Sequence, residues 1–271
     1  MTDRGGRAIT GLTQPDFEMY DENAPQKILY FEHEPDPLDL LLLLDVSGSM
    51  HPSLAELGAD ARAALRPLGA RDRCAVMLFA RSAVLSRKFT PDFAAVERAI
   101  QSAGDAQTLG SGTAINAAIV AAAGYFREEV SSARRAILIV TDNLSLNYRI
   151  PDEQVIRELY AADTTLNAIL IGRERRPQPP KPGTYVNPDF TPADVFKLAE
   201  ETGGEAVESR EAHKSFALMI ERIRSRYRLQ YAAPPSEPGQ LRHLRVQLAP
   251  AARGRYPRAV IRSRKAYYAV Q

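Results

Sequence analysis

The sequence predicts an α/β fold, in which a doubly wound, mostly parallel sheet carries helices on both faces. From residue 40 onward, short apolar runs alternate with helical patterns, which is typical of this class. The five leucines at residues 40–44 are too few to cross a bilayer, which takes about 20 apolar residues. Such a run, ending in a turn signal, indicates a strand buried on both faces of a parallel sheet. The hydrophobic fraction of 45% and the charged fraction of 25% are those of an ordinary globular protein.

The elements of the predicted sheet domain follow one another along residues 37–228. Strands are expected at residues 40–44, 74–80, 83–89, 136–141, 166–171 and 205–208, and helices at 53–65, 92–99, 113–126, 152–160, 193–202 and 211–226. Residues 83–89 are expected to fold back beside 74–80 as a hairpin. Residues 172–189 hold three arginines and five prolines, which indicates an exposed loop. Because this loop follows the end of a strand, we expect it at the carboxyl edge of the sheet, where Asp45 directly follows the leucine strand.

The two ends of the chain are expected to form a small β unit beside the sheet domain. Residues 1–36 are predicted to be one β-rich extension, and residues 229–271 a second extension that packs against the first. The first has turn-rich segments at 11–17 and 20–26, with positive φ expected at Asn23, and then a strand at 27–32. The second is predicted to hold strands at 229–232, 241–248 and 259–268, separated by turns at Gly239 and Gly254.

Opposite charges favour the pairing of these two ends. Residues 1–50 contain ten acidic and three basic side chains, and residues 209–271 contain fourteen basic and three acidic ones. Surface ion pairs contribute only about 0–1 kcal/mol each, so burial must supply most of the stability. We expect Ile28, Tyr30, Leu244 and Val246 to provide it, and the β unit to lie on the side away from Asp45.

The single cysteine and the first residues leave the compartment open. Cys74 stands in an apolar run, which excludes an intramolecular disulfide and indicates a buried, unreactive thiol. Residues 1–7 lack the apolar core of a signal peptide.

The residues that follow the leucine strand carry the first sign of a binding site. Asp45, Ser47 and Ser49 stand at alternate positions, and Gly48 lets the backbone turn so that their oxygens can point to one spot. Carboxylate and hydroxyl oxygens without His or Cys suit a hard cation such as Mg²⁺ or Mn²⁺. The carboxyl end of a central strand is also where open α/β sheets bind ligands. The alternative is a turn in which Ser47 or Ser49 caps the next helix.

Two further segments complete the predicted site. Thr113 follows a glycine-rich loop at residues 110–112, and Asp142 directly follows the predicted strand at 136–141. Alone, Thr113 could cap a helix, and Asp142 could start a turn with Asn143. Together, the Asp-x-Ser-x-Ser, Gly-Thr and Thr-Asp segments all follow strands of one sheet. They predict a single metal site, formed by Asp45, Ser47, Ser49, Thr113 and Asp142.

With these motifs the sequence resembles the von Willebrand factor type A family, whose metal-ion-dependent adhesion site uses this set of residues. The resemblance covers residues 37–228, and the flanks, including 227–231 and 264–268, resemble a bacterial, Acidobacteria-type subgroup with a β-rich prefix and tail. It implies a Rossmann-like sheet of five parallel strands and one antiparallel edge strand. The sequence departs from the family at Asn143, where glycine is usual, and from the subgroup at Ala117, where aspartate is frequent.

The resemblance also implies a role for each site residue. Ser47, Ser49 and Thr113 would be hydroxyl ligands, and Asp45 and Asp142 would act largely through water or hydrogen bonds. Neutral hydroxyl ligands leave a divalent cation under-neutralised, so the ion gains most from an added anionic oxygen. The expected function is therefore non-enzymatic: Mg²⁺- or Mn²⁺-dependent capture of a Glu or Asp of a protein partner. No small-molecule substrate and no membrane span are expected, and the resemblance suggests a location outside the cytoplasm.

Two other functions compete with this interpretation. The basic C-terminal region could bind nucleic acid or another polyanion, but neither a recognition motif nor a set of stacking aromatic residues accompanies its arginines. A metal-dependent hydrolase is the second alternative. The four histidines lack zinc spacing, and the glycine loop lacks the third glycine of a dinucleotide-binding fingerprint. No catalytic residue is therefore predicted.

Overall fold

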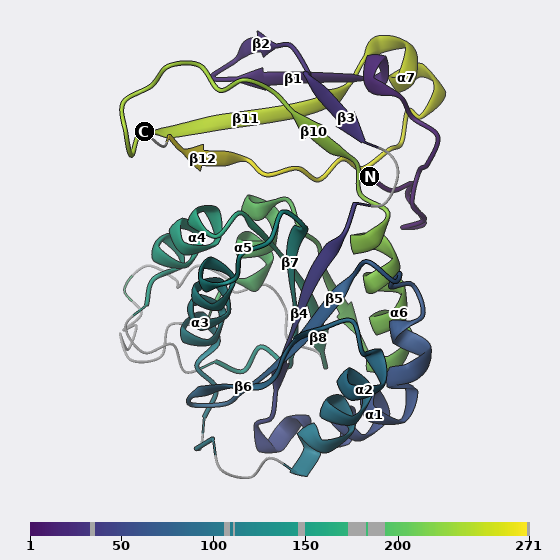
Figure 1. Ribbon diagram of the computed structural model, residues 1–271, viewed down its shortest axis with the longest axis vertical. Coiled ribbons are helices and arrows are strands. Elements are labelled where there is room, and N and C mark those ends of the chain that lie inside the picture. Colours follow the sequence, from purple (N-terminus) through teal and green to yellow (C-terminus); the bar gives the residue numbers. More distant parts are fainter. Residues whose placement is uncertain are drawn as a thin grey trace.

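A six-stranded sheet forms the centre of the larger part of the computed structural model (Figure 1). The structure describes residues 1–32, 36–105, 109–110, 112–145, 150–172, 183 and 193–269. The strand order is β6-β5-β4-β7-β8-β9. The strands are β4 (Leu38–Asp45), β5 (Arg73–Phe79), β6 (Ala83–Thr90), β7 (Arg134–Thr141), β8 (Thr164–Ile171) and β9 (Ala206–Ser209).

Five of these strands are parallel, and β6 is antiparallel to β5 at one edge. This arrangement confirms the predicted fold class, including the hairpin between residues 74–80 and 83–89. Strand β4, which contains the five leucines, lies between β5 and β7 and is therefore hydrogen-bonded on both sides. The carboxyl end of β4 is consequently close to the ends of both neighbours.

Helices cover both faces of the sheet because the leucines of β4 alternate between two cores. Leu40, Leu42 and Leu44 pack in one core with residues of α1, α2 and α6. Leu41 and Leu43 pack in the other with residues of α3, α4 and α5. The helices are α1 (His51–Leu65), α2 (Phe93–Gln101), α3 (Ile115–Glu128), α4 (Asp152–Ala161), α5 (Val195–Thr202) and α6 (Ala212–Arg224), with short 3₁₀ segments at Gln14–Asp16, Gly48–Met50 and Ser102–Asp105. Successive side chains of a strand point to opposite faces, and helices cover both faces of this sheet. Every position in the run must therefore be apolar, and all five leucines are buried.

The two ends of the chain pair with each other in a small β unit. One sheet has the order β12-β11-β1-β2, and β10 pairs with β3 in a second, two-stranded sheet. Strands β1 (Phe17–Asp21), β2 (Ala24–Gln26) and β3 (Tyr30–Glu32) come from the N-terminal segment; β10 (Arg228–Gln230), β11 (Leu241–Leu248), β12 (Ala266–Tyr268) and the short helix α7 (Pro250–Arg255) come from the C-terminal one. Both pairings between the two ends, β1 with β11 and β3 with β10, are antiparallel.

Some expectations for the ends are confirmed, and others were wrong in detail. The predicted turn segment at 11–17 is confirmed by the 3₁₀ turn at Gln14–Asp16, and the positive φ predicted for Asn23 is confirmed at 66°. The segment at 20–26 turns only at Glu22 and Asn23, and its other residues belong to β1 and β2. Of the strand predicted at 259–268 only β12 forms, with an isolated bridge from Val260 to Thr2, and α7 was not predicted. Tyr30 was expected to be buried but is 44% exposed, whereas Ile28 is buried.

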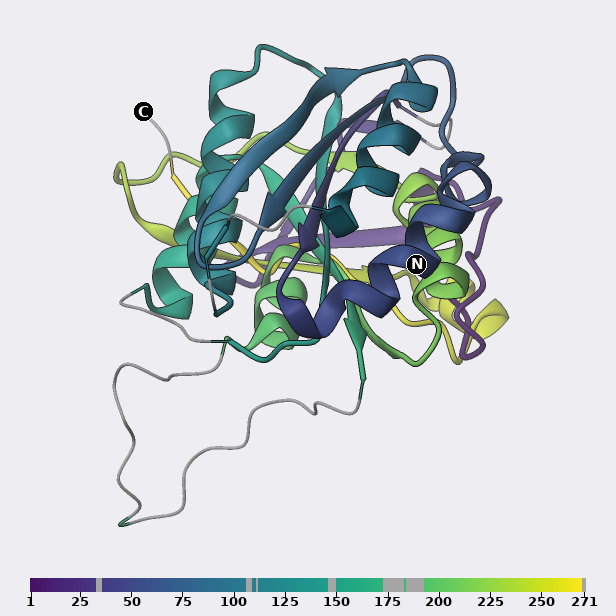
Figure 2. The same ribbon diagram turned by 90° about the horizontal axis from the view of Figure 1, so that it is seen from below.

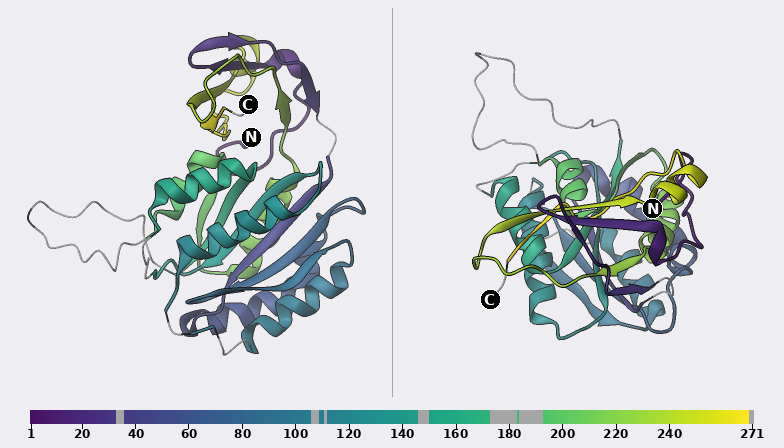
Figure 3. Two further views of the ribbon diagram at one scale, coloured as in Figure 1. Left: turned by 60° about the vertical axis from the view of Figure 1, so that its left-hand side comes forward. Right: turned by 90° about the horizontal axis from the view of Figure 1, so that it is seen from above.

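The β unit lies at the amino end of the sheet strands (Figures 1 and 3). Strand β4 starts beside the β unit and runs away from it, so Asp45 lies at the opposite end of the domain (Figure 2). The predicted loop at residues 172–189 falls, except for Gly172 and Gly183, outside the described residues. Within the part of the chain that the structure describes, no helix is long and apolar enough to span a membrane.

Candidate metal site

Asp45 is the buried centre of the predicted site. Its side chain is fully buried at the carboxyl end of β4. One carboxylate oxygen, Oδ1, accepts a hydrogen bond from the backbone N–H of Ser47 at 2.9 Å. The other, Oδ2, accepts one from the hydroxyl of Thr141 at 2.6 Å. These bonds fix the carboxylate between the loops that follow β4 and β7.

The two serine hydroxyls lie next to each other on the surface above Asp45. Ser47 Oγ and Ser49 Oγ are 3.3 Å apart. Neither side chain caps the helix that follows: the short 3₁₀ turn begins after Ser47 without a side-chain cap, and α1 begins after Met50, likewise without one. The capping alternative for Ser47 and Ser49 is therefore wrong, and their oxygens are not used by the helix start.

Thr113 also does not cap a helix. Helix α3 begins at Ile115, its N-cap residue is Ala114, and no side-chain cap bond is present. The preceding glycines, Gly110 and Gly112, have φ of 84° and 94°, a conformation that favours glycine. The Thr113 side chain is buried. Its backbone carbonyl accepts a hydrogen bond from Ser145 Oγ at 3.2 Å, which ties this loop to the loop after β7.

Asp142 starts a turn, as the structural alternative predicted. Its Oδ1 accepts a hydrogen bond from the N–H of Leu144 at 3.0 Å. Asn143 in this turn has φ of 61°, a left-handed conformation that asparagine tolerates better than most side chains. This explains how Asn143 can replace the glycine usual in the family. The Oδ1 of Asn143 is buried and has no hydrogen-bond partner among the described residues.

The electrostatics of the site favour a cation. Burial raises the pKa of Asp45 from 3.8 to about 6, although hydrogen bonds from Thr141 and Ser47 lower it, and the negative charge of Asp142 adds to the increase. The ionised form of Asp45 therefore lacks a compensating positive charge. Nearby positive charge would stabilise that form and lower the pKa again.

The residues present fit a hard divalent ion. Two carboxylates and three hydroxyls, without His or Cys, form the oxygen-only donor set that Mg²⁺ and Mn²⁺ prefer. In the described part of the chain, no cluster of three or more His, Cys, Asp or Glu residues could hold a metal by itself. Any ion here would thus depend on the hydroxyls of Ser47, Ser49 and Thr113. That dependence is the pattern that the family resemblance implies.

Thr141 was not among the site residues predicted from the sequence. Its hydroxyl donates to Asp45 and accepts from the N–H of Asn143 at 3.1 Å, so it positions two of the three loops. The signal was available, because Thr141 is a polar residue at the end of an otherwise apolar strand. Cys74, by contrast, is buried as expected, and burial raises the pKa of its thiol.

Comparisons with known proteins give the same fold. Residues 40–144 match the family profile of the von Willebrand factor type A domain. Among solved structures, the chain is similar to the hypothetical protein BatB from Bacteroides thetaiotaomicron, with 18% identity and a TM-score of 0.53 over 69% of this chain and 97% of that one. It is also similar to a von Willebrand factor type A protein from Catenulispora acidiphila, with 18% identity, a TM-score of 0.52 and coverage of 76% and 49%.

A third similar structure is proximal thread matrix protein 1 from the mussel byssus, with 15% identity and a TM-score of 0.53 over 74% of this chain and 49% of that one. This chain thus spans about half the length of the Catenulispora and mussel chains. No curated protein matches the sequence. The family match lies on β4 to β7, the strands that carry Asp45 and Asp142. The six-stranded sheet domain therefore has the fold of von Willebrand factor type A domains, and its residues 40–144 match the profile of that family.

Proposed function

We propose that this protein binds Mg²⁺ or Mn²⁺ at Asp45, Ser47, Ser49, Thr113 and Asp142, and uses the ion to capture an acidic residue of a protein partner. The observation that carries the proposal is the buried, uncompensated carboxylate of Asp45 below two adjacent serine hydroxyls. The ion would supply positive charge to this carboxylate. Its remaining coordination positions would face solvent beside the exposed Ser49.

The chemistry of the donor set explains why the partner should be acidic. Three neutral hydroxyls in contact with a divalent ion leave much of its charge unbalanced, and a Glu or Asp carboxylate from outside would balance it. The set contains no His, Cys or Lys, and the Ser47 hydroxyl faces the fully buried carboxylate of Asp45, so the arrangement favours binding over catalysis. We further propose that residues 1–36 and 229–271 form an accessory β unit, as in the Acidobacteria-type subgroup that the flanks resemble.

The metal part of the proposal is tested by thermal unfolding in EDTA and in millimolar Mg²⁺ or Mn²⁺. An ion that binds only the folded state stabilises it by about 2.7 kcal/mol at a hundredfold excess over its Kd. Asp142→Ala and Ser47→Ala should lose this stabilisation. Ser86→Ala, at an exposed position of the edge strand β6, which β5 separates from β4, is the matched control and should keep it. An equal metal response in Ser47→Ala and Ser86→Ala contradicts the site.

The partner part is tested with the full chain immobilised as bait. A bound protein from the native source should be released by EDTA, and it should bind again when Mg²⁺ is restored. Bait that carries Asp142→Ala should retain none of it. Binding that is indifferent to EDTA would mean that the metal does not mediate capture.

The structure weakens the polyanion alternative. Many arginines of the C-terminal region already pair with carboxylates, which reduces their attraction for external phosphate. Such pairs join Arg242 to Asp21 at 2.7 Å, Arg228 to Asp36 at 2.8 Å and Arg262 to Glu205 at 3.2 Å. Two of these pairs join the oppositely charged ends of the chain, and the third joins the C-terminal segment to the sheet domain.

A further inference from the structure

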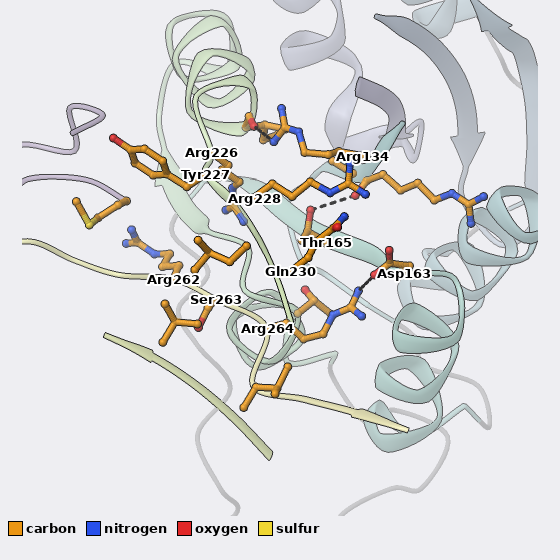
Figure 4. Close-up of a pocket in the computed structure, with 18 of the residues that line it drawn as sticks. Arg134, Asp163, Thr165, Arg226, Tyr227, Arg228, Gln230, Arg262, Ser263 and Arg264 are labelled. Carbon is orange, nitrogen blue, oxygen red and sulfur yellow. Dashed lines mark hydrogen bonds and ion pairs between the residues drawn. The ribbon is translucent and has the colours of Figure 1, made fainter. Parts of the chain in front are cut away.

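A cavity lies between the β unit and the amino end of the sheet domain, on the side opposite the candidate metal site (Figure 4). Its volume is about 680 Å³, within the range of roughly 300–1,000 Å³ that is typical of small-molecule sites. The sheet domain and the β unit both line it. The two sides differ in chemistry.

One side of the cavity is strongly cationic. Six arginines line it: Arg134, Arg135, Arg226, Arg228, Arg262 and Arg264. The only carboxylate among the described lining residues is Asp163, which pairs with Arg264 at 2.6 Å. Figure 4 shows the side chains of Arg134, Arg226 and Arg228 gathered in the same part of the cavity.

Three of these arginines form no ion pair within the described part of the chain. Arg134 donates to the carbonyls of Ile223 and Arg224, at the end of α6. Arg226 donates to the carbonyl of Gly203 at 2.6 Å and to Asn167 Oδ1 at 3.2 Å. The third, Arg135, likewise donates only to backbone carbonyls.

These bonds have a structural role, because they satisfy carbonyls at helix ends, but they do not balance charge. A guanidinium has five N–H donors, and all three arginines are only half-buried, so each can still reach a ligand. Burial lowers the pKa of Arg226 to about 10, and the positive charge of Arg134 lowers it further. Partly buried arginines are usually paired with an anion, so these three leave an unbalanced positive charge in the cavity.

The other side of the cavity is apolar. Phe17 and Met19 of β1, Leu244 and Val246 of β11, and Ile261 all line it. These residues belong to the core of the β unit, but Leu244, Val246 and Ile261 are only partly buried. Apolar surface in the same cavity as unpaired arginines suits a molecule that is apolar at one end and anionic at the other.

We propose that the cavity binds a small amphipathic anion, with an apolar body of acyl size and a carboxylate or phosphate head. The head lies against Arg134 and Arg226, where planar guanidinium groups can make paired hydrogen bonds to either anion. The body lies against Leu244, Val246 and Ile261. A ligand bound this way joins the β unit to the sheet domain.

The test is isothermal titration calorimetry of the full chain with four probes below their micelle-forming concentrations: decanoate, decyl phosphate, decanol and decyltrimethylammonium. Decanoate or decyl phosphate should bind, and whichever binds more tightly identifies the head group. Decanol and decyltrimethylammonium should bind at least tenfold more weakly, because a charge-assisted hydrogen bond is worth about a factor of ten. Failure of both anions to bind, or equal binding of decanol, overturns the proposal.

Three variants locate the site. Arg226→Gln should weaken binding of the preferred anion about tenfold or more. Val246→Glu places a carboxylate inside the cavity, opposite the arginines, and should abolish binding of the anion. This second variant tests the location even if Arg226→Gln does not fold. Arg245→Gln is the control, because Arg245 is the exposed neighbour of Val246 and stacks on Tyr20 instead of lining the cavity. Equal losses in Arg245→Gln and in the cavity variants refute the location.

Discussion

The stability of the β unit is expected to depend on Asp21, and Asp21→Asn tests this at constant side-chain shape. Asp21 is fully buried on β1 and receives hydrogen bonds from three residues of the C-terminal segment. Arg242 Nε donates to Oδ1 at 2.9 Å, and the hydroxyls of Tyr231 and Tyr267 donate to Oδ2 at 2.7 and 2.8 Å. One carboxylate therefore joins the N-terminal segment to three separate parts of the C-terminal one.

The expected cost follows from what the substitution leaves behind. Asparagine keeps one acceptor oxygen, but it removes the charge that balances Arg242, whose side chain is only 12% exposed. Removing one partner of a buried ion pair costs about 3–5 kcal/mol. Burial alone would raise the pKa of Asp21, but the hydrogen bonds from Arg242, Tyr231 and Tyr267 lower it overall. A lowered carboxyl pKa stabilises the fold above the unfolded pKa of about 3.9, and this stabilisation is lost as the pH falls through the folded pKa.

The assay is urea unfolding followed by tyrosine fluorescence, since the chain has eleven tyrosines and no tryptophan. The difference between the wild type and Asp21→Asn should be complete at pH 7 and shrink below about pH 4. Asp60→Asn is the control, because Asp60 is an exposed carboxylate whose ion-pair contact, with His213, is at 3.9 Å. Hydrogen exchange should place the loss in β1, β11 and β12. If Asp21→Asn costs no more than Asp60→Asn, the buried carboxylate does not hold the two ends together.

Two further predictions concern the metal site. Asp45→Asn should stabilise the metal-free protein at pH 7–8 by up to about 3 kcal/mol, because it removes a buried carboxyl whose pKa is raised to about 6. A raised carboxyl pKa means that wild-type stability falls as the pH rises from about 4 to 6, and urea unfolding in EDTA should show this fall in the wild type only. Asn143→Ala should be about 1–2 kcal/mol less stable than Asn143→Gly, since the φ of 61° is left-handed; equal urea midpoints would contradict this.

The sheet domain could be predicted because its signals are local and strong. A leucine run buried on both faces admits few alternatives, and each predicted strand and helix of this domain overlaps an observed one. The clustering of Asp45 with Ser47 and Asp142 followed from topology, since parallel strands that lie next to one another end at the same edge.

The ends were harder to predict because their pattern depends on partners far along the chain. In β1, Phe17, Met19 and Asp21 are the buried positions, so a charged residue occupies an inward position. Such a residue is stable there only because Arg242 and two tyrosines surround it, and no local signal indicates this. The arginine-lined cavity could not be predicted for the same reason, because Arg134 and Arg226 are 92 positions apart in the sequence and line one cavity only in the folded chain.

Strand β7 links the two candidate sites within one element. It begins with Arg134 and Arg135, which line the cavity, and ends with Thr141, which positions Asp45 at the candidate metal site. At about 3.3 Å per residue, the seven steps from Arg134 to Thr141 place these ends about 23 Å apart. β7 is hydrogen-bonded along its length to β4 and β8, and the two candidate sites share no contact residue. Stabilisation by an anion at one end and by a cation at the other should therefore add, as expected for separated sites without shared contacts.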